Sequence, residues 1–459
     1  MEAILNALKD TLGPDAVRTG NDIDSRYFGD WSARSTVPPL AVVLPQNTQD
    51  VAAALRLCNE ARQSVVPQGG LTGLAGGAVP TSRDICISLE RMTGIEEIDR
   101  SAATMTVRAG TTLQAIQEAA AAEDFEFQLD LGARGSCQIG GNLATNAGGI
   151  RVIQSGTARD QVLGLEVVLA DGSVLSAMGK MIKNNTGYDL RHLFIGSEGT
   201  LGIITRAVLR LAPRPAGRHT ALCALSGYEG AVTLLQTLKA RLGKELSAFE
   251  LMWPDFFELG VSFTRSQQAP FSAPYPLYAL IEHTSYANDR HESLAQTLES
   301  QLESGLLLDA VIAQSASQAQ SLWEIREATA EFPVKLTPIN FDISIPIGEI
   351  GNFVNTCRAE FESHWPASRS FFFGHIGDSN LHITVDGRSI PGVAPDAVEN
   401  VVYELVRTFQ GSVSAEHGIG VHKRPFLGYT RSETELACMR SIKHALDPNG
   451  ILNPGKLFS

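Results

Sequence analysis

Residues 67–80 read Pro-Gln-Gly-Gly-Leu-Thr-Gly-Leu-Ala-Gly-Gly-Ala-Val-Pro and follow the apolar pair Val65-Val66. Five glycines stand between positions 69 and 77. Such a density of glycine allows positive φ angles, so several backbone N–H groups can point at one anion such as a pyrophosphate. The segment is neither the GxGxxG turn of a Rossmann fold nor a Walker loop. Taken alone, it could equally be a flexible surface loop.

The glycine-rich pattern recurs three times downstream, each time between apolar runs. It returns at 135–149, around the Asp171-Gly172 turn of a hairpin predicted at 164–175, and at 196–202 before a strand predicted at 203–211. Upstream, residues 40–44 read as a strand and Thr48 begins a helix. Several separated loops rich in Gly, Asn, Ser and Thr can line one long ligand. The pattern predicts an α+β nucleotide-binding domain that is not a Rossmann fold.

Composition limits the possible partners and the number of domains. The 459 residues are 44% hydrophobic and 19% charged, which predicts a globular chain of two or three domains. The formal charge of −13 disfavours nucleic acid as a partner. The six cysteines form no CxxC pair, and residues 1–10 resemble an amphipathic helix rather than an apolar leader. We therefore expect a soluble cytoplasmic protein, with peripheral contact at the inner membrane as the alternative.

A change of pattern after Pro213-Arg-Pro215 predicts a second domain over residues 214–412. Its alternation of strands and helices favours an antiparallel sheet backed by helices, of the ferredoxin-like kind. We expect strands at 221–225, 249–253, 277–281 and 311–313, and helices at 228–242 and 288–302. The expected domains are 1–213 for the nucleotide and 214–412 as a second domain, followed by a C-terminal segment, 413–459.

Two histidines flank a polar turn in the stretch Phe371-Phe-Phe-Gly-His-Ile-Gly-Asp-Ser-Asn-Leu-His-Ile-Thr-Val385. On one continuous strand His375 and His382 would face opposite ways, but a turn between them can bring both imidazoles to one point. The run Ser414-Ala-Glu-His-Gly-Ile-Gly420 supplies further ligands. Two imidazoles and a carboxylate suit zinc or a similar divalent ion. By spacing alone, two packed or solvent-facing histidines remain the simpler interpretation.

Seven motifs together resemble the FAD-binding PCMH-type dehydrogenases and oxidases related to vanillyl-alcohol oxidase. The resemblance is closest to the branch of D-2-hydroxyglutarate, D-lactate and glycolate dehydrogenases, and it spans nearly the whole chain. The motifs are PQGGLTG (67–73), IGGNLATNAGG (139–149), TGYDL (186–190), GSEGTLG (196–202), GHIGDSNLH (374–382), AEHG (415–418) and DPNGILNPGK (447–456).

The resemblance implies that FAD is held by the glycine-rich loops and the C-terminal segment, 413–459, which returns to the flavin domain. It also implies that residues 214–412 form the substrate-binding domain. The first loop contains no histidine, where relatives with covalent flavin often carry one, so we expect noncovalent FAD. The implied cofactor-binding residues are Pro67, Gln68, Gly69, Gly70, Leu71, Thr72, Gly73, Gly135, Ser136, Ile139, Gly140, Gly141, Asn142, Thr145, Asn146, Gly148, Gly149, Glu198, Gly199, Gly202, Ile203 and Asn453.

The same resemblance assigns metal ligands to His375, His382 and Glu416, and the acid/base role to His417. Neighbouring residues 416 and 417 can serve one site only if the backbone bends there, as Gly418 and Gly420 would permit. In the implied reaction a hydroxy acid chelates the ion, the metal lowers the hydroxyl pKa, the histidine takes the proton, and hydride passes from C2 to flavin N5.

Substrate contacts are implied for Arg326, Thr329, Asn340 and Thr384. The arginine lies in a Leu-Trp-x-x-Arg context, and a guanidinium binds a carboxylate in a bidentate way. Relatives that act on 2-hydroxyglutarate have lysine near Asn340 and often asparagine at position 384. These differences weaken the case for a dicarboxylate, although Lys335 is near in sequence. The substrate therefore stays open between 2-hydroxyglutarate, lactate and a bulkier 2-hydroxy acid.

The favoured hypothesis is an FAD- and metal-dependent D-2-hydroxyacid dehydrogenase. A glycolate oxidase-type flavoprotein subunit, a flavin-binding module without turnover, and a metal-dependent hydrolase are the alternatives, and the hydrolase would not explain the glycine loops. The resemblance implies electron-transfer flavoprotein, a quinone or a cytochrome as electron acceptor. It leaves a homodimer open.

Overall fold

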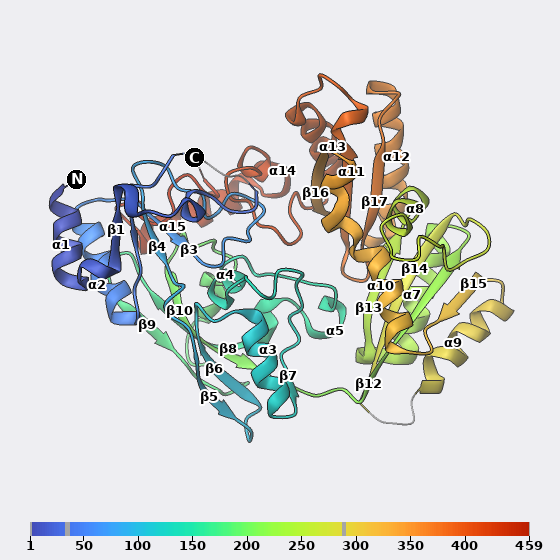
Figure 1. Cartoon of the computed structure of the whole chain (residues 1–459), viewed down its shortest axis with the longest axis horizontal. Helices are drawn as coiled ribbons and strands as arrows, with labels where there is room; N and C mark the ends of the chain where they lie inside the picture. The colour runs from blue at the N-terminus through green and yellow to red at the C-terminus, as the bar shows by residue number, and fades with distance from the viewer. Residues whose placement is uncertain (1, 33–36, 287–290, 459) are drawn as a thin grey trace. The chain divides into compact units, whose positions relative to one another are not determined.

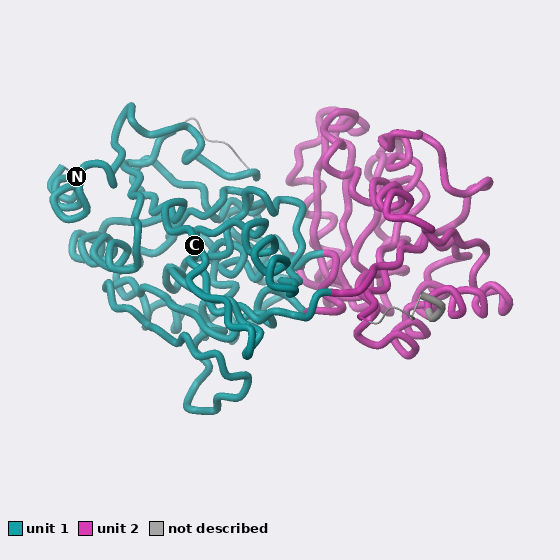
Figure 2. Tube along the Cα trace, turned by 60° about the horizontal axis from the view of Figure 1, so that its bottom comes forward, with its two compact units in different colours: residues 1–149, 156–214, 416–459 teal, residues 150–155, 215–415 magenta. Residues whose placement is uncertain are grey.

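The computed structural model describes residues 2–32, 37–286 and 291–458 (Figure 1). Its contacts divide the chain into two compact units (Figure 2). Unit 1 comprises residues 1–149, 156–214 and 416–459, and unit 2 comprises 150–155 and 215–415. The sequence pattern does not indicate that 150–155 joins unit 2. The predicted domain limits at 213/214 and 412/413 stay predictions.

Unit 1 contains two principal sheets. The first has the order β1-β2-β4-β3, in which β2, β4 and β3 run parallel, and the second is antiparallel with the order β5-β6-β10-β8-β9. The strands are β1 (Val17–Thr19), β2 (Ala41–Val43), β3 (Val65–Gln68), β4 (Ile85–Ser88), β5 (Ile95–Asp99), β6 (Thr104–Arg108), β8 (Val162–Val168), β9 (Val174–Ala177) and β10 (Ile203–Arg210). A two-stranded ladder joins β7 (Phe125–Glu126) and β11 (Ala212–Pro213).

Side-chain caps define where several helices of unit 1 begin. Asn47 accepts from the Asp50 N–H ahead of one helix, and Ser432 forms a capping box with Glu435 ahead of another. The longer helices are α1 (Glu2–Leu12), α2 (Thr48–Glu60), α3 (Leu113–Ala122) and α15 (Glu433–Leu446), and the shorter ones are α4 (Ile139–Ala144), α6 (Arg191–Phe194) and α14 (Leu427–Thr430). After α15 the chain pairs with β3, because Val65 donates to Ile451 and accepts from Asn453.

Unit 2 is built on one antiparallel sheet of seven strands with the order β15-β12-β14-β13-β17-β18-β16. The strands are β12 (Gly217–Leu225), β13 (Leu246–Met252), β14 (Leu277–Ser285), β15 (Leu307–Ile312), β16 (Pro338–Ser344), β17 (Ser370–His375) and β18 (Asn380–Asp386). The helices are α5 (Val152–Ser155), α7 (Tyr228–Leu242), α8 (Pro254–Val261), α9 (His291–Glu303), α10 (Ala316–Glu327), α11 (Phe332–Lys335), α12 (Ile350–His364) and α13 (Pro395–Thr408). The expected fold class, α+β with an antiparallel-sheet second domain, is confirmed.

The expected strands of unit 2 are observed with different limits, and the one expected at 249–253 covers Leu246–Met252. The strand expected at 311–313 covers Leu307–Ile312 instead, because the run pairs with β12 from its first leucine. Strand β16 covers Pro338–Ser344 and includes Asn340. The helix expected at 288–302 is observed as α9, and the start expected at 288–290 lies outside the described residues.

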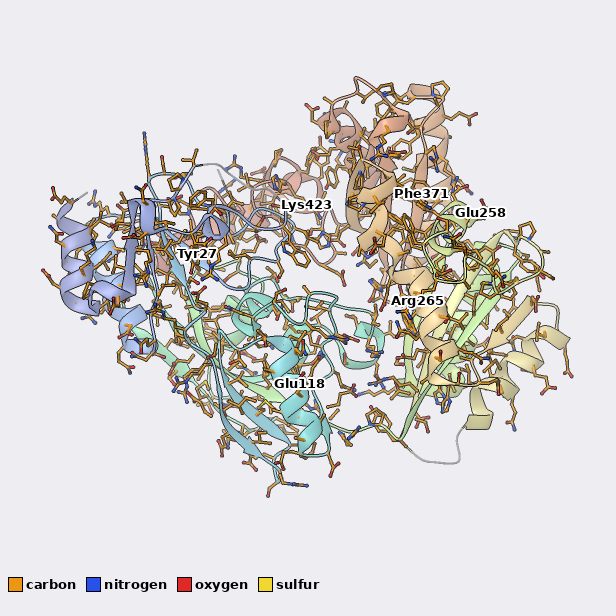
Figure 3. The ribbon with its side chains drawn as sticks, in the orientation of Figure 1. Tyr27, Glu118, Glu258, Arg265, Phe371 and Lys423 are labelled. Carbon is orange, nitrogen blue, oxygen red and sulfur yellow. The ribbon has the colours of Figure 1, made fainter. Side chains whose placement is uncertain are left out.

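An aromatic and aliphatic cluster packs α8 and α10 onto one face of the unit 2 sheet. Phe256 stacks on Phe373 with ring centroids 4.1 Å apart, and Phe371 is buried in the same cluster (Figure 3). Burying a phenylalanine contributes about 1.5–3 kcal/mol, so the Phe256–Phe373 contact holds α8 against β17, and α10 packs on α8. None of the helices in the described parts of the chain is long and apolar enough to cross a membrane.

Candidate functional site

Three glycine-rich loops converge in unit 1, and two glycines make the approach possible. A Cβ on Gly70 would lie 2.0 Å from the carbonyl oxygen of Ser136, so the first and second loops touch backbone to backbone. A Cβ on Gly199 would lie 2.9 Å from Cγ of Pro67, which brings the third loop against the first. Gly199 also has a φ of +70°, which side chains rarely adopt. The loops that were predicted to share one ligand therefore lie together.

Four residues other than glycine adopt the left-handed conformation at these loops and in the C-terminal motif 447–456. Such residues are uncommon and gather at ligand sites, where the surrounding structure holds them in place. They are Leu71 (φ +57°), Asn146 (+50°), Glu198 (+53°) and Asn453 (+44°), and all four belong to the residues predicted to bind FAD.

Four buried amide oxygens around the same loops have no hydrogen-bond partner among the described residues. They belong to Gln68, Gln138, Asn142 and Asn453. A buried acceptor without a donor costs about 1–3 kcal/mol, so this cluster fits a ligand that supplies donors. FAD carries ring N–H, amino and hydroxyl groups of this kind. The residues present therefore fit the cofactor, and Gln138 is a candidate that sequence reasoning missed.

Buried side chains link the loops to the C-terminal segment. The Glu198 carboxylate accepts hydrogen bonds from the backbone N–H groups of Ile419 and Gly420, both at 2.8 Å. The Asn453 amide donates to the carbonyl oxygens of Gly77 (3.0 Å) and Glu198 (2.7 Å). Burial raises the pKa of Glu198, although the two N–H groups and Lys423 oppose the shift. The predicted FAD residue Glu198 therefore uses its side chain to hold residues 419 and 420.

In unit 2, the hairpin β17–β18 brings the two predicted metal ligands together. Phe373 pairs with His382 across the hairpin, and the left-handed Ser379 (φ +76°) turns the chain into β18. The rings of His375 and His382 lie edge to face with centroids 5.2 Å apart. The turn therefore brings the two imidazoles close together, as the spacing of the two histidines required. Nδ1 of His382 also lies 3.9 Å from a carboxylate oxygen of Asp342 in β16.

Glu250 links one candidate metal ligand to the candidate substrate arginine. One carboxylate oxygen lies 2.6 Å from Nδ1 of His375, and the other accepts from Nε of Arg326 at 2.7 Å. Glu250 is fully buried. Burial alone would raise its pKa, but His375 and Arg326 outweigh that effect and lower the pKa to about 2. Sequence reasoning missed this residue, although an isolated glutamate in the apolar run 248–252 is a detectable signal.

Arg326 extends from α10 over the site face of the sheet. Its guanidinium carbon lies 4.7 Å above the ring of Phe373, and the residue is only 6% exposed. Thr329, half-buried, follows within a short 3-10 turn (Ala328–Glu331). Arg326 is therefore buried, paired with Glu250 and stacked on an aromatic ring, and is unlike an exposed helix arginine.

The other two candidate substrate residues contact each other on the same face. The Thr384 hydroxyl donates to Oδ1 of Asn340 at 2.8 Å across the β16–β18 pair. Lys335 does not approach this pair, because its ammonium group binds the Ser262 hydroxyl at 2.8 Å and lies over the Phe263 ring. The expectation that Lys335 compensates for a missing lysine near residue 340 therefore has no support in these contacts.

Glu416 is bonded directly to Ala415, the last residue of unit 2. The Ala415 N–H group lies 3.4 Å from the carbonyl oxygen of Asp342 in β16, so Glu416 starts from the edge of the unit 2 sheet. One ligand atom each from His375, His382 and Glu416 lies within 4.8 Å of the others. This set of two imidazoles and a carboxylate fits a divalent ion. His417 follows, and the positive φ of Gly418 (+81°) and Gly420 (+51°) provides the expected bend.

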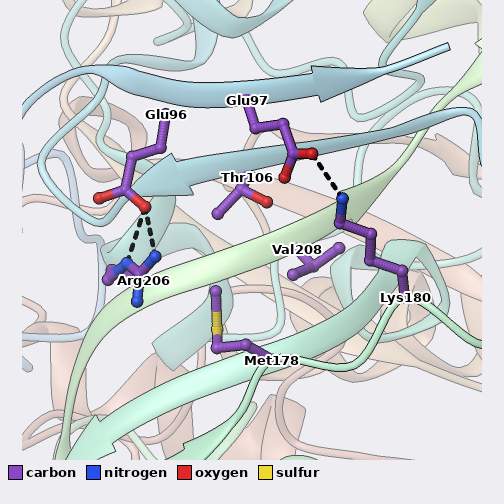
Figure 4. Close-up of a pocket in the computed structure, with 7 residues that line it drawn as sticks. All are labelled: Glu96, Glu97, Thr106, Met178, Lys180, Arg206 and Val208. Carbon is purple, nitrogen blue, oxygen red and sulfur yellow. Dashed lines mark hydrogen bonds and ion pairs between the residues drawn. The ribbon is translucent and has the colours of Figure 1, made fainter.

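A cavity of about 360 Å³ on the five-stranded sheet of unit 1 is a poor candidate for the active site (Figure 4). It contains four charged side chains, and each of them has an ion-pair partner. Arg206 pairs with Glu96, and Lys180 pairs with Glu97 at 2.8 Å. Since these charges already neutralise one another, the cavity offers an anionic substrate no uncompensated cation.

Comparison with known proteins assigns both halves of the chain. Residues 39–177 match the family model "FAD binding domain", and residues 214–457 match "FAD linked oxidases, C-terminal domain". The chain belongs to the FAD-linked oxidases. It is therefore an FAD-dependent oxidoreductase.

Relatives agree with this family over nearly the full length of the chain. A D-2-hydroxyglutarate dehydrogenase of Xanthomonas citri pv. viticola is 41% identical, with 95% of this chain and 93% of that protein covered. A putative mitochondrial D-lactate dehydrogenase of Schizosaccharomyces pombe is 36% identical, with 95% and 84% covered. The fold is similar to that of p-cresol methylhydroxylase with substrate bound, at a TM-score of 0.77 and 15% identity, over 99% of this chain and 96% of that one.

Proposed function

We propose that this chain oxidises a D-2-hydroxy acid, of the 2-hydroxyglutarate or lactate type, to the 2-oxo acid with noncovalent FAD and a divalent metal ion, zinc being the first candidate. The observation that carries the proposal is the buried Glu250 carboxylate, which binds His375 and Arg326 together. Because one carboxylate holds both a metal-binding imidazole and a carboxylate-binding guanidinium, the site suits a substrate that has a hydroxyl next to a carboxylate.

Each residue of the proposed site has one role. His375, His382 and Glu416 hold the metal ion, and His375 binds through Nε2 because its Nδ1 faces Glu250. Arg326 binds a substrate carboxylate and fixes its orientation. His417 accepts the hydroxyl proton at a ring nitrogen, which suits an imidazole because its ordinary pKa lies near neutrality. When bound, the flavin accepts the hydride and the ion polarises the hydroxyl.

The distal end of the substrate meets polar and uncharged groups on the unit 2 face. Asn340 and Thr384 are neutral, and Lys335 is occupied by Ser262 and Phe263. This composition leaves lactate and other monocarboxylic 2-hydroxy acids as strong candidates beside 2-hydroxyglutarate, the substrate named for the Xanthomonas relative. A substrate panel must therefore include both kinds of acid.

An anaerobic spectral titration tests the proposed function. The purified protein should absorb as an oxidised flavin, and a D-2-hydroxy acid should bleach that absorption while its L-enantiomer does not. D- and L-lactate, D- and L-2-hydroxyglutarate and D- and L-malate form the panel. Flavin that stays oxidised with every acid would reject the proposal. The metal role is tested separately, because verified metal-free protein should lose the bleaching and regain it with zinc.

The proposed electron acceptor is electron-transfer flavoprotein, a quinone or a cytochrome, and the proposed location is the cytoplasm. After reduction by the substrate, each acceptor class is added without oxygen and the return of the flavin absorption is timed. The class that restores the spectrum fastest is the physiological candidate. Sedimentation of the holoenzyme tests the homodimer.

A further inference from the structure

A buried asparagine on the site face has both polar atoms of its side chain without a partner. Asn380 is 3% exposed, and neither its Oδ1 nor its Nδ2 forms a hydrogen bond with any described residue. A buried amide in this state is unfavourable, because the hydrogen bonds that it makes to water in the unfolded chain are not replaced. Such a group calls for an explanation, and a ligand that completes its bonding is a common one.

Strand register places this amide beside the candidate metal ligands. Asn380 is opposite Ser344 in the β16–β18 pair, and His382 is opposite Asp342 two residues further along. Residues two apart on a strand share a face, so Asn380 lies on the face that carries His382 and Thr384. In the facing strand, a Cβ on Gly374 would lie 2.4 Å from the carbonyl oxygen of Asn380, so the residue next to His375 touches the Asn380 backbone.

The backbone at this point is shaped to present the side chain. Ser379, the residue before it, has a φ of +76°, and the N–H of Asn380 donates to the Asp378 carboxylate at 3.2 Å. The Lys239 ammonium group holds the same turn through the carbonyl oxygen of Gly377 at 3.0 Å. A serine in the left-handed region is strained, and such strain is retained where a side chain must be aimed.

We propose that Asn380 is a substrate-binding residue that contacts the hydroxyl and carboxylate groups of the 2-hydroxy acid. This inference rests on the proposed function. One amide offers an acceptor at Oδ1 and two donors at Nδ2. An α-hydroxy carboxylate offers the matching set on adjacent carbons, a hydroxyl donor and carboxylate acceptors. The amide thus recognises the part of the substrate that all 2-hydroxy acids share, whereas Asn340 and Thr384 meet the part that varies.

The test compares Asn380→Leu with the wild-type holoenzyme. Leucine has nearly the shape of asparagine and removes both unmade bonds, so FAD content, metal content and Tm should stay at or above the wild-type values. In contrast, KM for the hydroxy acid should rise at least tenfold, as should the Kd for the 2-oxo acid product measured from the flavin spectrum. Two lost bonds of about 1 kcal/mol each correspond to that order of change.

Asn380→Asp separates substrate binding from metal binding. If residue 380 contacts the substrate, the aspartate carboxylate should repel the anionic product and weaken its binding more than leucine does. If residue 380 is a metal ligand, aspartate should preserve or strengthen metal retention, whereas leucine should lower it. Thr284→Val is the matched control, because Thr284 is a fully buried residue of the same unit whose hydroxyl also forms no hydrogen bond with a described residue. This control should not change KM.

The results divide clearly between the two proposals. If the wild-type protein oxidises a 2-hydroxy acid and Asn380→Leu leaves KM and product Kd unchanged, the inference is wrong and the amide binds only water. A fall in metal content or Tm in Asn380→Leu would also overturn it, in favour of a ligand or structural role. If the wild-type protein oxidises none of the acids, the failure belongs to the proposed function.

Discussion

At the scale of single residues, Glu250 determines how the site is held. Its two oxygens bind His375 and Arg326, and its pKa of about 2 keeps it charged at neutral pH. A carboxylate behind a metal-bound histidine fixes the ring orientation and strengthens the ligand. We therefore treat Glu250 as a positioning residue, since it acts through two others.

Glu250→Gln should lower metal affinity about 10–100-fold, which is the usual effect of losing such a partner. KM should rise together with the metal loss, because Arg326 loses its fixed orientation. Metal per protein after gel filtration and a separation of KM from kcat measure the two effects. Glu250→Asp is the conservative comparison, and it should recover part of the metal content. Full metal retention and an unchanged KM in Glu250→Gln would show that the carboxylate does not position either residue.

The sequence identified His375 and His382 but not Glu250, which binds His375, and the reason is physical. The turn between His375 and His382 is local, so the residues that make it stand next to one another in the sequence. Glu250 is 125 positions from His375, and only the pairing of β13 with β17 brings them together. Asn380 was visible in the quoted stretch, but its missing hydrogen bonds become evident only when all its neighbours are placed.

At the scale of elements, the glycine loops and the segment after His417 depend on one buried side chain. Glu198 receives the N–H groups of Ile419 and Gly420, and Asn453 in turn binds the Glu198 carbonyl oxygen. The family resemblance implied that the loops and the C-terminal segment share a ligand. It did not predict that Glu198 would bind protein backbone, since the motif is equally compatible with a carboxylate that contacts the cofactor.

Glu198→Gln should loosen residues 419 and 420 and weaken FAD binding. The glutamine oxygen can accept a hydrogen bond from one of the two backbone N–H groups, but the glutamine NH₂ group is a donor and cannot accept from the other. One buried N–H donor is then left unpaired, at a cost of about 1–3 kcal/mol. FAD dissociation, followed by flavin fluorescence, should accelerate roughly 5–100-fold on that basis. Glu118→Gln, an exposed change on α3 (Figure 3), is the control and should have no effect. An unchanged dissociation rate in Glu198→Gln would mean that the loops do not depend on this contact.

A second element, the segment 150–155, is fixed to unit 2 by a buried ion pair. Arg151 donates to both oxygens of Glu282, at 2.8 and 3.0 Å, and Ser247 donates to one of them. Burial alone would raise the pKa of Glu282, but Arg151 outweighs it and lowers the pKa. A carboxyl group whose folded-state pKa is lowered adds stability above its unfolded pKa of about 4.3, and that stability is lost as the pH falls through the folded pKa.

The stability difference between wild type and Glu282→Gln should therefore be large at pH 6–8 and shrink below about pH 4. Removing the charge leaves Arg151 without its buried partner, which typically costs about 3–5 kcal/mol. Urea unfolding at a series of pH values measures the difference. Glu258→Gln, a change at an exposed position of unit 2 (Figure 3), serves as the control and should follow the wild-type pH dependence. A difference that persists unchanged at low pH would show that the ion pair does not supply it.

At the scale of the whole molecule, the residues expected to bind the two cofactors fall largely into different units. The glycine loops and Asn453 belong to unit 1, whereas His375 and His382 belong to unit 2. The order of motifs predicted this division, because the flavin loops precede residue 214 and both histidines follow it. The return of the chain to the first domain was expected only through the family resemblance, with its limit at 412/413, and the contacts of the structure place Glu416 first in unit 1.

This division predicts that flavin and metal can be removed independently. Chelation should leave the FAD content at the wild-type level while it abolishes bleaching by the substrate, and deflavinated protein should retain His375 and His382 as metal ligands. Restoring FAD to the deflavinated protein at about 100 times its Kd should stabilise the fold by roughly 2.7 kcal/mol, since a ligand that binds only the folded state stabilises it by mass action. Metal analysis of deflavinated protein, flavin analysis of chelated protein and urea unfolding of each form provide the measurements. If chelation released the flavin as well, one binding site would depend on the other. The first residue to test for that coupling would then be Glu416, where the chain passes from unit 2 back to unit 1.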